Sequence, residues 1–157
     1  MENLAAKEEF LRSEFVAALR TINPNTAPLF GKMNPQQMVE HMAEYIRLGY
    51  GNPVVTQFFY TAESVERTRA FIMSDKPFKE NTPNPIMGET PKPIIQPTYE
   101  AAIKDAEMAI KELFEAFGKN DKLEVASPFF GILNYEMTIQ LLTKHAEHHL
   151  RQFGIKS

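Results

Sequence analysis

A chain of 157 residues is long enough for one domain with its own core, and its hydrophobic (43%) and charged (24%) fractions are ordinary for a globular protein. A net charge of -3 gives no basic stripe, and no apolar run approaches the roughly 18 residues of a membrane span, so neither nucleic acid nor membrane is expected as a partner. The absence of cysteine excludes disulfides, thiolate ligands and a cysteine nucleophile. The N-terminus lacks the apolar core of a signal peptide, so we expect a cytoplasmic protein.

The first half of the chain carries the apolar periodicity of helices. The first predicted helix covers about residues 3–21. The second begins at Asn34, a good N-cap that precedes a proline in the first turn, and it ends near Gly49 or Gly51. A shorter helix is predicted over about residues 61–73.

Residues 74–97, SDKPFKENTPNPIMGETPKPIIQP, interrupt the helical pattern and hold more than half of the eleven prolines. Proline removes backbone donors and stops helices, which predicts an extended connection over the surface. Its length exceeds that of a routine loop, and a structural strap and an active-site lid both fit it. Its apolar residues predict that it packs on the body: Phe78, Ile86, Met87, Ile94 and Ile95.

Two more helices complete the pattern. The third long helix begins after Thr98, a good N-cap, and ends near Gly118; the fourth begins at Asn134 and runs to Phe153, before Gly154. No convincing strand is apparent. We therefore predict an all-α fold, with residues 1–157 forming a single four-helix-bundle domain and a long crossover between the second and third long helices.

Three of the four histidines lie in KHAEHHLRQFG, residues 144–154. Because an α-helix turns about 100° per residue, His149 and His145 lie on one flank, roughly 55° and 95° from the centre of the core face. His148 lies roughly 155° away, beside a polar stripe that we expect to be solvated: Glu136, Gln140, Lys144, Glu147 and Arg151. His41 occupies a similar flank position on the second helix, about 90° from its apolar side.

Two histidines four residues apart can chelate one metal ion if another ligand comes from elsewhere. The helical directions select His41, His145 and His149, and they leave His148 as a solvated neighbour or outer-shell group. Three imidazoles would leave at least one coordination position open and would suit zinc, nickel, copper or ferrous iron. The simpler alternative is a solvated helix end whose histidines only interact favourably with the helix dipole.

Three stretches resemble the motifs of a branch of small proteins within the DinB-like superfamily of four-helix bundles, which includes relatives of metal-dependent thiol transferases. They are FGKMNPQQMVEH (30–41), SPFFG (127–131) and KHAEHHLRQFG (144–154), of which the last is the most specific. The resemblance covers nearly the whole chain. Two positions depart from the pattern, since Ser127 stands where the branch usually has histidine and Met137 where it often has tryptophan.

The resemblance implies a DinB-like bundle with a divalent metal held by three histidines, which here are His41, His145 and His149. Zinc or nickel is favoured, with iron or manganese as alternatives. Relatives of this kind use the metal to activate a low-molecular-weight thiol for transfer or isomerisation, so an enzyme of this type is expected. A divalent ion on three histidines could equally activate a water for hydrolysis. Because this chain has no cysteine, any thiol must come from a cosubstrate.

Three further residues are candidates for the chemistry. Gln37 and Gln152 project toward the ligand flanks and could orient a substrate or the other ring nitrogen of a ligand. Glu44 lies about 60° beyond His41 and could act as a base. For each of them a solvated surface position is the alternative. For the whole protein, the alternatives are a non-catalytic metal-binding or stress-associated bundle and a partner-binding bundle with vestigial histidines; a homodimer is compatible with all of these.

Overall fold

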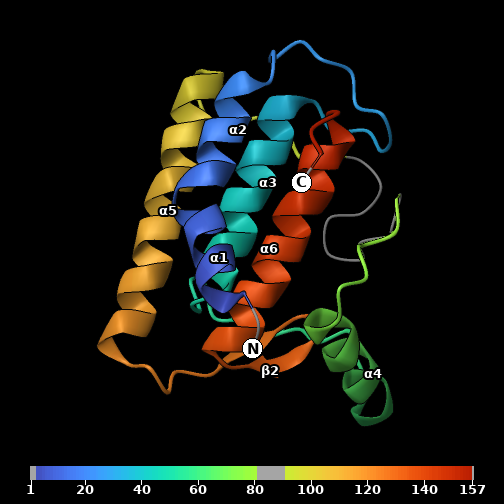
Figure 1. The fold of residues 1–157 in the computed structure, drawn as a ribbon, viewed down its shortest axis with the longest axis vertical. Helices are drawn as coiled ribbons and strands as arrows, with labels where there is room; N and C mark the ends of the chain where they lie inside the picture. Colours follow the sequence, from blue (N-terminus) through green and yellow to red (C-terminus); the bar gives the residue numbers. More distant parts are fainter. Residues whose placement is uncertain (1–2, 81–90, 157) are drawn as a thin grey trace.

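The computed structural model describes residues 3–80 and 91–156, and this part of the chain is mostly helical (Figure 1). The first predicted helix is present as a continuous run in which a π-helical segment, Phe10–Glu14, separates α1 from α2. The remaining predicted helices are also present, with ends within a few residues of those expected. The bounds are α1 (Leu4–Glu9), α2 (Phe15–Thr21), α3 (Pro35–Leu48), α4 (Ala62–Met73), α5 (Tyr99–Lys119) and α6 (Tyr135–Gln152).

The helices α1–α2, α3, α5 and α6 run alongside one another and share one apolar core, whereas α4 lies at one end and contacts α6 (Figure 1). The continuous α1–α2 run, α3, α5 and α6 each carry apolar side chains at helical spacing. These apolar faces pack against one another, and many of their side chains are fully buried. The core includes Phe15, Leu19, Met38, Met42, Ile46, Ile103, Leu113, Ile139 and Ala146. Within the described residues, no helix combines the length and the apolar character needed to cross a membrane.

The start of α3, which carries His41, is fixed by a reciprocal cap. The Asn34 side chain accepts from the Gln37 backbone N–H at 2.8 Å, and the Gln37 side-chain oxygen accepts from the Asn34 N–H at 2.9 Å. Both interactions satisfy donors that would have no partner at a helix N-terminus.

We expect Asn34→Ala to lower the free energy of unfolding by about 1 kcal/mol, because it leaves the Gln37 N–H without its cap. Urea unfolding monitored by circular dichroism measures the loss. Asn34→Ser is the matched control, since its hydroxyl can still accept this hydrogen bond. Equal losses in the two variants would contradict a capping role.

Two short strands correct the expectation of a fold without strands. β1 (Val125–Ser127) pairs antiparallel with β2 (Gly131–Leu133), so that Val125 lies opposite Leu133. Strands of three residues are too short to show an alternating apolar pattern, which explains why the sequence did not reveal them. The Phe130 N–H donates to the Ser127 hydroxyl at 2.8 Å and closes the turn between them.

The turn of this hairpin depends on a glycine. Gly131 has a φ of 82°, and a Cβ there would lie 2.6 Å from a methyl carbon of Val65 in α4. Both the left-handed backbone and the close approach of α4 therefore favour glycine at this position. The hairpin is thereby held against α4, with Phe129 and Phe130 in its turn.

The described parts of the 74–97 connection form neither helix nor strand, as predicted, but they are held differently from the expectation. Phe78 is half-buried, whereas Ile94 (51% exposed) and Ile95 (82% exposed) do not pack on the body. Polar contacts hold this arm instead: the Ile95 N–H donates to the Glu40 carboxylate at 2.8 Å, and the Gln96 N–H donates to it at 3.1 Å. Ile86 and Met87, and with them the choice between lid and strap, lie outside the described residues.

Candidate metal centre

The three predicted ligands come together between α3 and α6. His41 projects from α3, and His145 and His149 project from successive turns of α6. One ring nitrogen from each lies within 4.8 Å of the others. The Nε2 atom of His145 lies 3.0 Å from the Nε2 atoms of both His41 and His149. The group can therefore hold one metal ion.

Gln152, one turn beyond His149, determines which nitrogen of His149 carries the proton. The Gln152 Nε2 amide donates to the Phe30 carbonyl at 2.9 Å, so its Oε1 atom is the one that faces His149. That oxygen lies 2.9 Å from His149 Nδ1 and can only accept, which places the proton on Nδ1. The lone pair of His149 Nε2 then points toward His145 and His41, as a metal ligand requires.

Three neutral imidazoles cannot form good hydrogen bonds at all of these close nitrogen–nitrogen contacts. A ring nitrogen has one in-plane position, which holds either a proton or a lone pair. His145 Nε2 therefore cannot form good hydrogen bonds to His41 and His149 at the same time, although both lie 3.0 Å away. For a tetrahedral ion with metal–nitrogen distances of about 2.0–2.1 Å, neighbouring ligand nitrogens lie about 3.3 Å apart. The two 3.0 Å contacts are close to that spacing, so one shared cation would suit these nitrogens.

The surroundings keep the three rings neutral. Burial lowers the pKa of His41 to about 4, and repulsion from His148, when that ring is protonated, and from Lys92 contributes further. Burial, followed by the mutual repulsion of the cluster, holds the pKa values of His145 and His149 well below the usual range. Neutral imidazole is the form that binds metals, so the lone pairs are available at neutral pH.

The structure indicates why the FGKM stretch has a glycine at position 31. Gly31 has a φ of 74°, and a Cβ there would lie 2.7 Å from the Gln152 Nε2 amide. Next to it, the Leu29 N–H donates to the Gln152 backbone carbonyl at 2.8 Å. The close approach of residues 29–31 to the end of α6 therefore holds Gln152 in place behind His149.

His148 differs from the expectation of a solvated neighbour. It is half-buried, with its ring 5.2 Å from the Phe30 ring and 5.9 Å from the Phe78 ring, centroid to centroid. Its Nδ1 atom is buried and has no hydrogen-bond partner among the described residues. Burial, with the nearby charge of Arg151, lowers its pKa to about 4. The helical wheel placed His148 away from its own helix's core face, but loops from other parts of the chain cover that direction.

Gln37 and Glu44 have other contacts in this structure. The Gln37 side chain caps α3, and its amide donates to the Lys92 carbonyl at 3.1 Å. The Glu44 carboxylate forms an ion pair with Lys92 at 2.9 Å. Neither lines the pocket above the histidines, so a part in catalysis remains a prediction for both.

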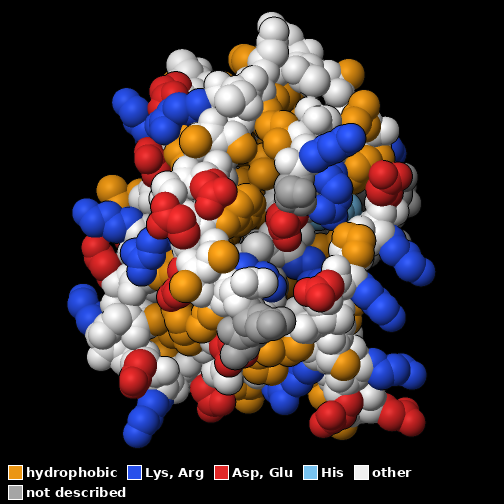
Figure 2. All heavy atoms as spheres, in the orientation of Figure 1, with side chains coloured by type: hydrophobic (Ala, Val, Ile, Leu, Met, Phe, Trp, Pro, Cys, Tyr) orange, Lys and Arg blue, Asp and Glu red, His pale blue; other side chains and the backbone are white. Residues whose placement is uncertain are grey.

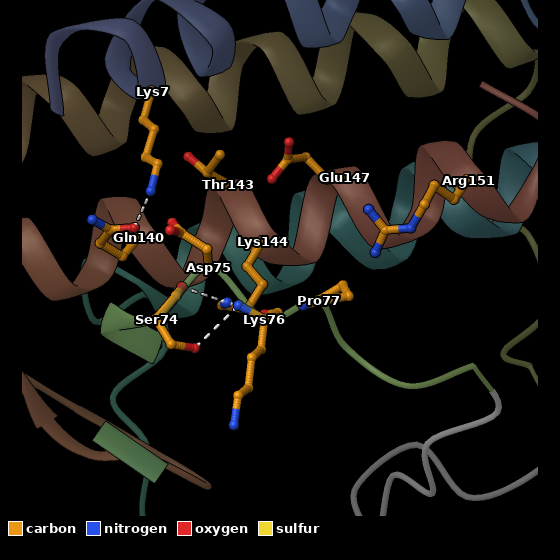
Figure 3. Close-up of a pocket in the computed structure, with 10 residues that line it drawn as sticks. All are labelled: Lys7, Ser74, Asp75, Lys76, Pro77, Gln140, Thr143, Lys144, Glu147 and Arg151. Atoms are coloured by element: carbon orange, nitrogen blue, oxygen red, sulfur yellow. Dashed lines mark hydrogen bonds between the residues drawn. The ribbon is translucent and has the colours of Figure 1, made fainter. Parts of the chain in front are cut away.

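Two members of the expected polar stripe on α6 are buried, which corrects the prediction of a solvated face. Figure 3 shows their contacts with Lys7 and with the chain after α4. Lys144 is 7% exposed, and its Nζ atom donates to the carbonyl oxygens of Ser74 and Lys76. Gln140 is 3% exposed and accepts from Lys7 Nζ. These contacts border a small pocket of about 320 Å³. The chain after α4 covers Lys144, and burial, followed by repulsion from Lys7, lowers its pKa.

A larger pocket of about 990 Å³ lies above the triad, with His41, His145 and His149 among its lining residues. Aromatic side chains from separate parts of the chain form much of its wall: Phe30, Tyr45, Phe71, Phe78, Phe129 and Phe130. Sequence reasoning did not identify this wall as part of the site. The signal available was the presence of Phe30 in FGKM and of Phe129 and Phe130 in SPFFG.

No protein-family model, curated protein or solved structure matches this chain. The interpretation of the site therefore depends on the geometry of the triad and of the pocket above it.

Proposed function

We propose that this chain is a DinB-like four-helix-bundle metalloprotein in which His41, His145 and His149 hold one divalent ion, and that it acts as a metal-dependent transferase or hydrolase. Zinc or nickel fits three imidazole donors best, before iron or manganese. The observation that carries the proposal is the pair of 3.0 Å contacts at His145 Nε2, which cannot both be good hydrogen bonds at once and which one shared cation would suit.

When bound, such an ion acts as a Lewis acid and lowers the pKa of a thiol or water that it binds. The residues of the chain then supply the rest. Gln152 orients His149, and the aromatic wall provides an apolar space above the open side of the triad from which water can be excluded. Because the chain has no cysteine, a low-molecular-weight thiol would enter as a cosubstrate.

Thiol transfer is favoured over hydrolysis by the lining of this pocket. Among the described residues, no Asp or Glu lines it. Hydrolysis commonly uses a carboxylate or a histidine as general base, and His148 is the histidine in the lining that is not a proposed ligand. A thiol that ionises on binding needs no such base for its attack. The same lack of a carboxylate favours the second candidate, a metal-binding bundle without turnover.

The first test is X-ray fluorescence at the metal edges of protein purified without a histidine tag. We expect one equivalent of a divalent ion, a rise in melting temperature when that ion is added to chelator-treated protein, and loss of both in His145→Ala. His148→Gln is the matched control and should keep the ion. Substoichiometric metal with no metal-dependent change in melting temperature would overturn the proposal.

Turnover separates the enzyme from the second candidate. The metal-loaded protein is assayed with a panel of small thiols and a chlorinated dinitrobenzene as electrophile. We expect a rate above the uncatalysed reaction that falls at least about 100-fold in His41→Ala. Full metal occupancy without any turnover would favour the non-catalytic bundle.

A further inference from the structure

The pocket above the triad carries charge of one sign. Lys32, Lys76 and Lys79 line it, whereas no Asp or Glu does among the described residues. The lysines come from two segments, since Lys32 precedes α3 and the other two flank Phe78 in the connection after α4. Figure 2 shows histidine surface beside Lys or Arg side chains and hydrophobic side chains on one face of the molecule.

Two of these lysines, Lys32 and Lys76, form no salt bridge with a carboxylate among the described residues. The contrast is Lys92, which lies outside the pocket lining and pairs with Glu44 at 2.9 Å. A lysine ammonium at the rim of an apolar pocket attracts an anion, and because these side chains are exposed the attraction weakens with salt.

The remaining walls suit an apolar molecule. Phe71, Phe78, Phe129 and Phe130 form a continuous set of ring contacts, with the Phe78 ring 5.4 Å from Phe71 and 6.5 Å from Phe130. The volume, about 990 Å³, is at the upper end of the range for small-molecule sites, about 300–1,000 Å³. A ligand of this pocket therefore has a sizeable apolar body.

We propose that the pocket binds an aromatic organic anion, with its ring among Phe78, Phe129 and Phe130 and its anionic group at the lysines. That this anion is a substrate rests on the proposed metal-dependent function; that it binds depends only on the walls and the lysines. An apolar cation would meet the lysines and, among the described residues of the lining, no carboxylate. A neutral analogue would bury the same apolar surface but gain nothing from the lysines.

The test is isothermal titration calorimetry of chelator-treated protein with three probes of matched size: 4-phenylbutanoate, 4-phenylbutan-1-ol and 4-phenylbutan-1-amine. We expect the carboxylate to bind at least about tenfold more tightly than the alcohol, the amine to bind most weakly, and the preference to shrink with salt. The ring C–H signals of the histidines in proton NMR should shift as the carboxylate binds, which locates it in this pocket.

Charge-reversal variants test whether the lysines bind the anionic group. Lys32→Glu and Lys76→Glu should each weaken carboxylate binding about tenfold or more and leave the alcohol nearly unchanged. Both side chains are exposed, so folding is not at risk. Lys111→Glu, an exposed position on α5 outside the pocket lining, is the matched control and should change neither affinity.

The outcomes for the pocket and for the metal are separate. Equal affinities for carboxylate and alcohol, indifference to Lys32→Glu and Lys76→Glu, or no binding of any probe would overturn the anion proposal, even in a protein that holds stoichiometric metal. A lysine-dependent preference for the carboxylate in a protein that takes up no metal would support the anion site and refute the metal-dependent function.

Discussion

The metal-free protein should lose stability steeply as the pH falls from 6.5 toward 4. In the unfolded chain the histidines take up protons near pH 6.5, whereas burial keeps the pKa of folded His41 at about 4 and those of His145 and His149 well below the usual range. Between these values the unfolded state binds more protons, so acidification favours unfolding. At about 1.4 kcal/mol per pH unit for one proton, His41 alone contributes about 3 kcal/mol across this window.

Urea unfolding in the presence of a chelator, at several pH values between 7.5 and 4.5, measures this dependence. His41→Gln removes one of the groups, and its slope between pH 6 and 5 should be smaller by about 1.4 kcal/mol per pH unit. A carboxylate with a lowered pKa, such as Glu100 beside Arg20, acts at lower pH and does not account for this slope. A free energy of unfolding that stays constant from pH 7 to 5 would show that the histidines are not held neutral by burial.

The helix starts could be predicted from the sequence because their causes are local. Asn34, Thr98 and Asn134 each accept a hydrogen bond from a backbone N–H three residues later, and the preference for such residues at N-caps is strong. The pairing of His145 with His149 is similarly local, because residues four apart lie on one face of a helix. The match with His41 followed from equivalent flank positions on two helices that then proved to be neighbours.

The parts that could not be predicted depend on contacts between distant segments. A helical wheel gives the direction of a side chain relative to its own helix and does not show which loop covers that direction. Lys7 lies 133 residues before Gln140, and Ser74 lies 70 residues before Lys144, yet these pairs bury the expected polar stripe. The aromatic wall has the same origin, since Phe30, Phe78 and Phe130 come from three different connections.

Replacing Gln152 with leucine should weaken metal binding about 10- to 100-fold, although all three imidazoles remain. The leucine cannot accept from His149 Nδ1–H, so the ring is free to place its proton on Nε2, where the ion would bind. The change also leaves the half-buried Phe30 carbonyl without its donor, which should lower the free energy of unfolding by about 1 kcal/mol. Competition with a chromogenic chelator measures the affinity, and nitrogen-15 NMR of the imidazoles reports which nitrogen of His149 carries the proton.

Gln152→Glu separates the two roles of this side chain. Its carboxylate can still accept from His149 Nδ1–H but cannot donate to the Phe30 carbonyl, so we expect metal affinity close to that of the native protein together with reduced stability. Gly31→Ala acts on the same residue from the other side, since its Cβ would lie 2.7 Å from the Gln152 amide, and it should weaken both properties. If Gln152→Leu lost stability but bound the ion with unchanged affinity, Gln152 would only anchor residues 29–31, and the orientation of His149 would have to come from the packing of the rings around it.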